Sequence, residues 1–249
     1  MKSFYKASGM SKRKAGFGAI LNNTINVCKY HYENFKNDDI LIENDEILDI
    51  FETKKIDDVS EYIYDLEKFY DISGYPNPSN AHVLCDVELV KEKNKIFNMF
   101  FKIKNIEYFE LEKKKYINDK TLSIHIRGTD KNSEIPTPNL ETIYLKIEKM
   151  LSTNIIDNIF LATDDIFYLN NIISKFGNIV RHRNDKTISL DGKPIHFIEN
   201  RTKINKEMLI DAYLLSNSNY FLYCYSNVSY LALTMGINNF KKIDCINEN

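Results

Sequence analysis

The stretch that decides the fold is Lys120–Lys131, with the sequence KTLSIHIRGTDK. Apolar residues at positions 122, 124 and 126 alternate with Ser123, His125 and Arg127, which is the period of a β-strand. The alternation ends at Gly128, where a polar turn begins. A strand of an open α/β sheet that carries charged side chains at its carboxyl end is typical of a ligand crevice.

Arg127 is the most informative residue of this stretch. An arginine at a strand end favours an anion site, because its guanidinium can hold a phosphate through two parallel hydrogen bonds. Taken alone, the stretch is equally compatible with a surface ion pair between Arg127 and Asp130, which would contribute little stability.

Two later stretches end in the same way. The segment FLATDD, residues 160–165, closes a hydrophobic strand with two adjacent carboxylates. The segment YFLYCYSNVS, residues 220–229, closes a third strand with a small polar turn that opens a helix. Because the carboxyl ends of parallel strands meet at one edge of a sheet, the three loops predict a single site.

Strands and helices alternate after residue 119. We expect strands at 121–127, 156–162, 178–182 and 220–225, and helices at 138–152, 165–176, 204–217 and 227–236. This alternation predicts an α/β fold with a mostly parallel, doubly wound sheet and right-handed crossovers. The charged segment 112–119 marks the expected boundary between two domains, residues 1–118 and 119–249.

The amino-terminal half is less readable. Gly16 and Gly18 precede a helical run with one apolar face over 20–32, and a short strand is expected near 40–42. The two glycines could let backbone amides approach an anion or a sugar at the helix start, or simply form a tight strand-to-helix turn. Further on, charged helical patterns cover 59–69 and 87–101.

Composition excludes several classes of protein. The 249 residues are 43% hydrophobic and 27% charged with a net charge of −2, which describes an ordinary globular protein without the basic surface that nucleic acid requires. The four cysteines lack C-x-x-C spacing and are expected to be reduced core residues. Signal-peptide patterns and apolar runs of about 18 residues are absent from the sequence, so we expect no transmembrane segment.

The ordered set HIRGTDK, FLATDD and CYSNVS resembles the motifs of the superfamily of α1,6-fucosyltransferases, NodZ and protein O-fucosyltransferases. The resemblance covers roughly residues 120–237, and GFGAILNN at 16–23 is similar to the amino-terminal glycine loop of that family. In one departure, Gly128 stands where the family has a second arginine. The resemblance implies a GT-B fold, in which two Rossmann-like domains face each other across a cleft, with 1–118 on the acceptor side and 119–249 binding the nucleotide-sugar.

The resemblance also implies a function. It indicates an inverting, metal-independent glycosyltransferase that transfers a sugar, first of all L-fucose from GDP-fucose, to a glycan acceptor. Because Gly128 replaces an arginine, a nucleotide- or GDP-sugar-binding module without turnover is the alternative. Animal members of the family are membrane-anchored, and the lack of such a segment here predicts a cytoplasmic relative.

The resemblance assigns Arg127 to the pyrophosphate of the donor, together with the glycine loop of Gly16 and Gly18. The turn that opens the last helix would offer hydroxyls and amides to the same phosphates, from Ser226, Asn227 and Ser229. A simple helix cap by Ser226 or Asn227 is compatible with that role.

The resemblance also assigns the residues that recognise the guanine nucleoside and the general base that acts on the acceptor. Asp164, or its neighbour Asp165, would accept hydrogen bonds from guanine or ribose opposite His125. As alternatives, the two aspartates cap a helix and His125 is a satisfied core residue. Glu134, or otherwise Asp130, would act on the acceptor hydroxyl. Finally, Asp211 would orient Arg127 or the glycine loop. In the alternative interpretation, Asp211 is a helical aspartate that faces solvent.

Overall fold

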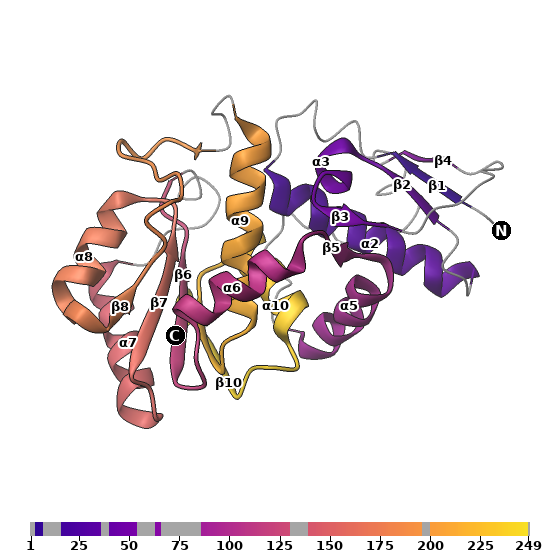
Figure 1. Ribbon diagram of the computed structural model, residues 1–249. Coiled ribbons are helices and arrows are strands. Elements are labelled where there is room, and N and C mark those ends of the chain that lie inside the picture. Colours follow the sequence, from indigo (N-terminus) through magenta and orange to yellow (C-terminus); the bar gives the residue numbers. More distant parts are fainter. Residues whose placement is uncertain are drawn as a thin grey trace. The chain divides into compact units, whose positions relative to one another are not determined.

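The computed structural model describes residues 3–6, 16–35, 40–53, 63–65, 86–129, 139–195 and 200–248. The chain forms two compact units, residues 1–106 and 107–249 (Figure 1). The units divide at the start of helix α6 (Ile106–Tyr116), and the domain boundary expected from the sequence lies just after this helix.

The second unit is built on a five-stranded parallel sheet with the order β10-β9-β6-β7-β8. Its strands are β6 (Thr121–Ile126), β7 (Asn158–Thr163), β8 (Val180–Arg181), β9 (Tyr220–Tyr223) and β10 (Lys242–Cys245). From the central β6 the chain adds β7 and β8 on one side and then β9 and β10 on the other. The winding therefore reverses between β6 and β9, and open sheets bind ligands at the carboxyl ends of the strands at such a point.

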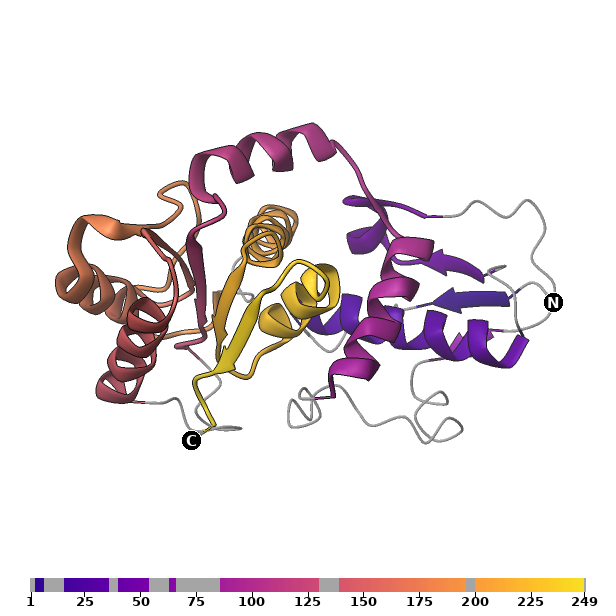
Figure 2. The same cartoon turned by 90° about the horizontal axis from the view of Figure 1, so that it is seen from below.

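Helices cover both faces of this sheet. Figures 1 and 2 show α7 (Leu140–Thr153) and α8 (Ile166–Phe176) on one face, and α9 (Arg201–Ser216) and α10 (Asn227–Gly236) on the other. Each helix begins after a residue whose side chain accepts a backbone N–H of the first turn: Asn139, Asp165, Asn200 and Ser226.

The alternation in β6 explains how the two faces differ. Leu122, Ile124 and Ile126 belong to the hydrophobic core that also contains side chains of α7 and α8. His125 points the other way and contacts Ser229 of α10. Both faces are buried, and one of them carries polar groups to the carboxyl edge of the sheet.

All eight elements expected after residue 119 are present, so the α/β fold with a parallel sheet is confirmed. Strand β8 is shorter than expected because a 3-10 turn, η3 (Gly177–Ile179), precedes it and Gly177 has a φ of 65°. The sequence did not predict β10, a four-residue edge strand, or helix α6. The charged end of α6 resembled a boundary segment, whereas Phe109 of this helix packs edge-on against Tyr213 of α9.

The first unit contains a three-stranded parallel sheet, β2-β1-β4, and an antiparallel pair, β3-β5. Its elements are β1 (Ser3–Lys6), α2 (Phe17–Phe35), β2 (Ile40–Glu43), α3 (Asp45–Leu48), β3 (Phe51–Glu52), β4 (Ile63–Asp65), α5 (Val87–Phe100) and β5 (Lys102–Ile103). The helices expected at 20–32 and 87–101 and the strand at 40–42 are confirmed. The helical pattern at 59–69 is wrong at 63–65, because pairing with β1 overrides it.

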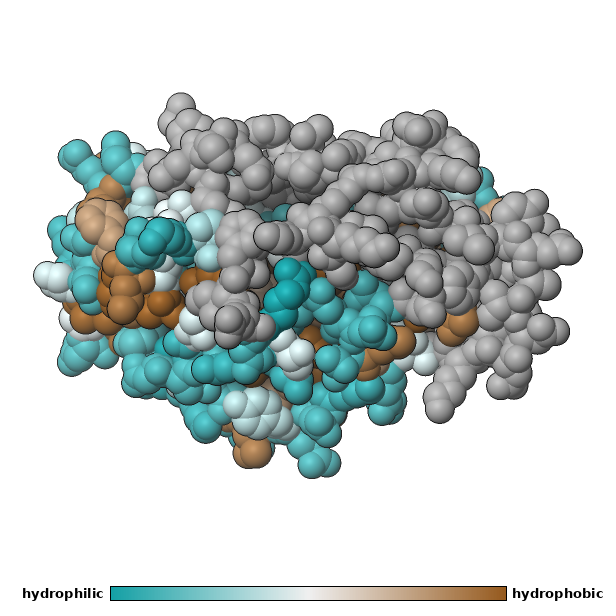
Figure 3. All heavy atoms as spheres, turned by 90° about the horizontal axis from the view of Figure 1, so that it is seen from above, coloured by the Kyte–Doolittle hydropathy of each residue, from teal (hydrophilic) through white to brown (hydrophobic). Residues whose placement is uncertain are grey.

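Figure 3 shows one face of the molecule, on which the coloured residues are mostly hydrophilic, with smaller groups of apolar residues between them. Exposed large apolar side chains include Leu145 of α7 and Ile155 of the segment that follows this helix. Among the described helices, none has the length and apolar character needed to span a bilayer.

Candidate functional site

Arg127 and Asp164 follow neighbouring strands and pair with each other. Nη1 of Arg127 lies 2.7 Å from Oδ2 of Asp164, and the two side chains are 18% and 8% exposed. The sheet register causes this contact, because Ile126 of β6 stands opposite Thr163 of β7 and the next residue of each strand emerges at the same level. Since the pair is largely withdrawn from water, it is screened less than an exposed ion pair.

Asp164 also holds the turn that follows β6. Its Oδ1 accepts the backbone N–H of Gly128 at 2.9 Å, and its Oδ2 accepts the hydroxyl of Thr129 at 2.8 Å. Three consecutive residues of the turn therefore bind one carboxylate. The guanine or ribose contact expected for Asp164 would have to compete with these bonds.

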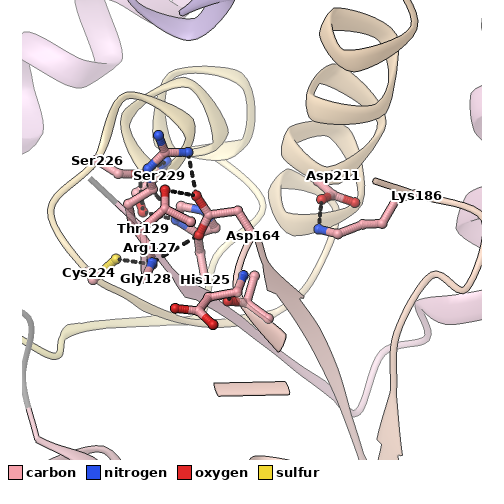
Figure 4. A network of polar contacts seen from close by, with 12 residues as sticks. His125, Arg127, Gly128, Thr129, Asp164, Lys186, Asp211, Cys224, Ser226 and Ser229 are labelled. Carbon is pink, nitrogen blue, oxygen red and sulfur yellow. Dashed lines mark hydrogen bonds and ion pairs between the residues drawn. The ribbon is translucent and has the colours of Figure 1, made fainter. Parts of the chain in front are cut away.

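Asp165 has a different task. Its Oδ1 accepts the backbone N–H of Phe167 at 2.8 Å, so Asp165 is the N-cap of α8. The capping interpretation of the aspartate pair is thus confirmed for Asp165. Asp164, by contrast, is directed toward Arg127 and its turn (Figure 4).

Gly128 is enclosed by the start of α8. A Cβ atom built at this position would lie 2.5 Å from Cβ of Asp165 and 2.8 Å from Cδ2 of Tyr168. Both distances are far below a van der Waals contact, so the close approach requires a glycine. An arginine at this position would have no room unless the turn moved.

His125 is buried, and it lies against the amino-terminal turn of α10. Its Nδ1 is 2.7 Å from Oγ of Ser229 and 3.2 Å from Oγ of Ser226. Burial lowers the pKa of His125 to about 4, although the negative charge of Asp164 acts in the opposite direction. The imidazole is therefore neutral at physiological pH, and it lines a pocket that Arg127 also lines.

Ser226 and Ser229 of the last motif form hydrogen bonds within the protein. Oγ of Ser226 accepts the backbone N–H of Ser229 at 3.1 Å, which confirms the capping interpretation of Ser226. Both hydroxyls are almost fully buried beside His125, so the phosphate contact expected of them would have to compete with these bonds. Asn227 begins the first turn of α10, where backbone N–H groups have no acceptor within the helix.

Cys224 connects the ends of β6 and β9. Its Sγ accepts the backbone N–H of Arg127 at 3.0 Å, and burial raises the pKa of this thiol to about 12. Cys224 therefore remains protonated and fixes the backbone from which Arg127 projects. The sequence indicated only a small core cysteine at this position.

A second polar cluster joins α9 to the loop after β8. Asp211 accepts Nη1 of Arg183 at 3.3 Å and Nζ of Lys186 at 2.5 Å. One turn earlier, Oε2 of Glu207 accepts the backbone N–H of Thr187 at 2.8 Å. Asp211 is thus buried rather than solvent-facing, and its described hydrogen bonds go to Arg183 and Lys186 rather than to Arg127.

The Arg127–Asp164 pair and the cluster around Asp211 line one pocket. Its charged or titratable lining residues are His125, Arg127, Asp164, Lys186, Glu207 and Asp211. Figure 4 shows Arg127 and Asp164 beside the start of α10, whereas Lys186 and Asp211 meet beside α9. Sequence reasoning missed Lys186 and Glu207. Lys186 could have been found by the rule that found Arg127, because it follows the end of the third expected strand, 178–182.

The remaining predicted site residues are Gly16, Gly18, Asp130 and Glu134. Gly16 immediately precedes α2 and Gly18 lies in its first turn, both in the first unit. The carbonyl of Gly16 accepts the backbone N–H of Ala19 at 2.9 Å, which agrees with a turn that starts a helix. Asp130 and Glu134 lie outside the described residues. Within the described ranges, no group of three or more His, Cys, Asp or Glu side chains is arranged to hold a metal ion.

Neither a protein-family model nor a curated protein matches the sequence. Solved structures do match. A structure of NodZ α-1,6-fucosyltransferase soaked with GDP-fucose aligns with a TM-score of 0.58 at 14% identity, over 94% of this chain and 93% of that one. The same enzyme co-crystallised with GDP gives 0.55 at 14% identity, over 94% and 92%.

A third match is the selenomethionine form of fucosyltransferase NodZ from Bradyrhizobium. Its TM-score is 0.56 at 14% identity, and the alignment covers 93% of this chain and 91% of that one. At this level of identity the similarity establishes the fold. The resemblance expected from the sequence is confirmed in that sense: over most of its length, this chain has the fold of the fucosyltransferase NodZ.

Proposed function

We propose that this chain is an inverting, metal-independent glycosyltransferase of the GT-B type. It transfers a sugar from a GDP-sugar to a glycan acceptor, and L-fucose from GDP-fucose is the first candidate. The observation that supports this most is the position of Arg127, which is held by Asp164 at the winding reversal of the sheet. A fold shared with a fucosyltransferase soaked with GDP-fucose supports the choice of donor.

The site residues match what the reaction needs. The acceptor oxygen attacks the anomeric carbon of the sugar, the bond from that carbon to the β-phosphate oxygen breaks, and GDP leaves with the electron pair. Negative charge grows on the β-phosphate, and a fixed cation aimed at it stabilises the transition state. The guanidinium of Arg127 has five N–H donors, so Asp164 and a phosphate can be bound together.

The start of α10 is a second element that suits an anion. This helix follows the carboxyl end of β9 after three residues, and its first turn carries backbone N–H groups and the positive end of the helix dipole. Asn227 and its neighbours would contribute these amides. The buried hydroxyls of Ser226 and Ser229 hold His125 and the turn in place, so their contribution is to position the amides.

The acceptor side is proposed for residues 1–118 and the donor side for 119–249, in two Rossmann-like domains. The parallel sheet β2-β1-β4 of the first unit supports the second such domain. Gly16 and Gly18, at the start of α2, would face the donor. Glu134 or Asp130 would take the proton of the acceptor hydroxyl, and the protein would act in the cytoplasm.

One observation favours a second candidate function. The packing of Asp165 and Tyr168 against Gly128 leaves no room for an arginine side chain at position 128. A chain that lacks this arginine could bind a GDP-sugar without turning it over. The alternative is therefore a nucleotide- or GDP-sugar-binding module with the same cleft.

One experiment separates the two candidates. Calorimetry with GDP tests binding, and release of GDP from GDP-fucose, with and without a panel of glycan acceptors, tests turnover. Binding together with acceptor-dependent release supports the transferase. Binding without release for every acceptor supports the module, and the absence of binding to GDP and GDP-fucose contradicts both.

A further inference from the structure

We propose that Lys186 is the second cation of the donor site and binds the diphosphate from the side of the pocket opposite Arg127. The inference rests on the proposed function, because it takes a nucleoside diphosphate as the ligand. It adds a residue that lies outside the three sequence motifs, in the loop between β8 and α9.

The side chain of Lys186 is held at the pocket rather than extended into water. It is 11% exposed, and its Nζ lies 2.5 Å from Oδ2 of Asp211. In the same loop, Lys193 also pairs with an aspartate, Asp191, but its side chain is 82% exposed. Lys193 thus belongs to an ordinary surface ion pair, whereas Lys186 is fixed where a ligand would lie.

The charge of the ligand requires more than Arg127. A nucleoside diphosphate carries two to three negative charges, and the positive charge of Arg127 is already offset by Asp164. Burying the remaining charge without a partner would be costly. Among the described residues, Arg127 and Lys186 are the arginine and lysine side chains that line this pocket.

Two described positions beside Arg127, Gly128 and His125, do not supply this charge. Gly128 has no room for a side chain, and His125 is neutral because burial lowers its pKa. The charge of Lys186 contributes to that lowering, which places it within electrostatic reach of the pocket centre. An ammonium group has three donors, so a bond to Asp211 leaves two for phosphate oxygens.

Asp211 has a second cationic partner besides Lys186, namely Arg183, which also pairs with the exposed Asp185. The side chain of Arg183, which is 1% exposed, lies 3.3 Å from the other oxygen of that carboxylate and also donates to the backbone carbonyl of Glu207. Arg183 therefore fixes the loop to α9. Removing the charge of Lys186 should leave this attachment in place and change the pocket alone.

The test compares Lys186→Gln, Lys186→Arg and the matched control Lys193→Gln with the wild type. Calorimetry is carried out with GDP, GMP and guanosine at one salt concentration, and thermal unfolding checks the fold of each variant. We expect Lys186→Gln to weaken GDP binding about tenfold or more, because a charge-assisted contact to phosphate is lost. The affinity for guanosine should stay within about twofold, and Lys186→Arg should restore most of the affinity for GDP.

The outcomes distinguish the inference from the function on which it rests. If the wild type and Lys193→Gln bind GDP and folded Lys186→Gln binds it equally well, the inference is wrong and the proposed function stands. If Lys186→Gln weakens guanosine as much as GDP, Lys186 does not act on the phosphates and the inference is also wrong. If the wild type does not bind GDP, both fail. Should Lys186→Gln not fold, Lys186→Met replaces it in the same comparison.

Discussion

Asp164 is bonded by three consecutive residues of the turn that carries Arg127. Its carboxylate receives Nη1 of Arg127 at 2.7 Å, the N–H of Gly128 at 2.9 Å and the hydroxyl of Thr129 at 2.8 Å. A carboxylate that is engaged on both oxygens in this way sets the direction of the arginine. We therefore expect Asp164 to act on a ligand through Arg127, as a positioning residue.

A double-mutant cycle tests this relationship. Arg127→Ala should lower kcat/KM for sugar transfer by about 100-fold or more, because roughly 3 kcal/mol of transition-state stabilisation is lost with one charge-assisted phosphate contact. Asp164→Ala should weaken GDP binding less than Arg127→Ala does. The double variant should bind GDP no more weakly than Arg127→Ala alone, because the two residues act as one unit.

Additive losses in the double variant would show that Asp164 contacts the nucleotide directly, as first expected from the sequence. Arg127→Ala that keeps more than about a tenth of wild-type activity would place the phosphate contact elsewhere. Thermal unfolding of each variant separates these results from a general loss of the fold.

Gly128 should tolerate no side chain. The Cβ of Gly128→Ala would stand 2.5 Å from Cβ of Asp165, so the turn or the start of α8 has to shift. We expect a loss of about 1–3 kcal/mol in the free energy of unfolding, which is typical of overpacking. Gly16→Ala is the control, because nothing lies within 4 Å of a Cβ built there.

Chemical denaturation of both glycine variants measures this difference. Because the shift would disturb the N–H that binds Asp164, Gly128→Ala should also weaken GDP binding. An alanine at 128 that leaves both stability and GDP affinity unchanged would contradict the close packing seen around this glycine.

The order of elements in the second unit could be predicted because each strand and helix there carries its own period. The alternation of Leu122, Ile124 and Ile126 with polar residues is readable from six residues. Strand β10 was not predicted because an edge strand of four residues has too short a pattern. Helix α6 was not predicted because its apolar face is narrow. Near Ile63, pairing with β1 decided the structure against a helical pattern.

The side-chain partners of the site were much harder to predict. Spacing placed Arg127 and Asp164 at neighbouring strand ends, but only the register of Ile126 with Thr163 shows that they meet each other. The partners of Asp211 come from a loop of no recognisable motif, which holds Arg183 and Lys186. Long-range pairs of this kind depend on tertiary packing, which a single sequence does not display.

Guanine nucleotides should bind and uridine nucleotides should not. Guanine presents an N1–H and an exocyclic amine as adjacent donors, and uracil lacks this pair. Glu207 is one of the described carboxylates that line the pocket, and its Oε1 is buried and accepts no hydrogen bond within the described residues. This oxygen forms an ion pair with Lys203, whose Nζ lies 3.4 Å away. A site that pairs such donors discriminates strongly against a base that leaves it unpaired.

Calorimetry with GDP and UDP measures this selectivity, on the wild type and on Glu207→Gln. Equal affinity of the wild type for the two nucleotides would refute the guanine assignment. Unchanged selectivity in Glu207→Gln would instead move base recognition to another group.

Transfer activity should survive EDTA. Asp164 and Asp165 are adjacent in sequence and engaged with Arg127 and with the cap of α8, whereas a magnesium site needs several oxygen ligands in near-octahedral order. Cationic side chains would instead stabilise the negative charge that develops on the leaving group. Complete loss of activity with EDTA, restored by Mg²⁺ or Mn²⁺, would assign the protein to a metal-dependent class.

Stability should fall as the pH drops from about 6.5 to about 4, because burial lowers the pKa of His125 from 6.5 to about 4 in the folded protein. The unfolded chain binds a proton in this window and the folded protein does not, so acidification favours unfolding. The full effect amounts to roughly 3 kcal/mol, since one pKa unit corresponds to about 1.36 kcal/mol. Above pH 6.5 this contribution to stability is fully present.

Denaturation curves at several pH values, for the wild type and for His125→Gln, isolate this contribution. The charges that act on His125 are Asp164 and Asp211, which favour protonation, and Lys186 and Arg127, which oppose it; all four remain in the variant. His125→Gln should therefore be less stable at pH 7, because its contacts with Ser226 and Ser229 change, yet lose less stability between pH 6.5 and 4. A variant with the same slope as the wild type would mean that other groups, and not the buried imidazole, take up the proton.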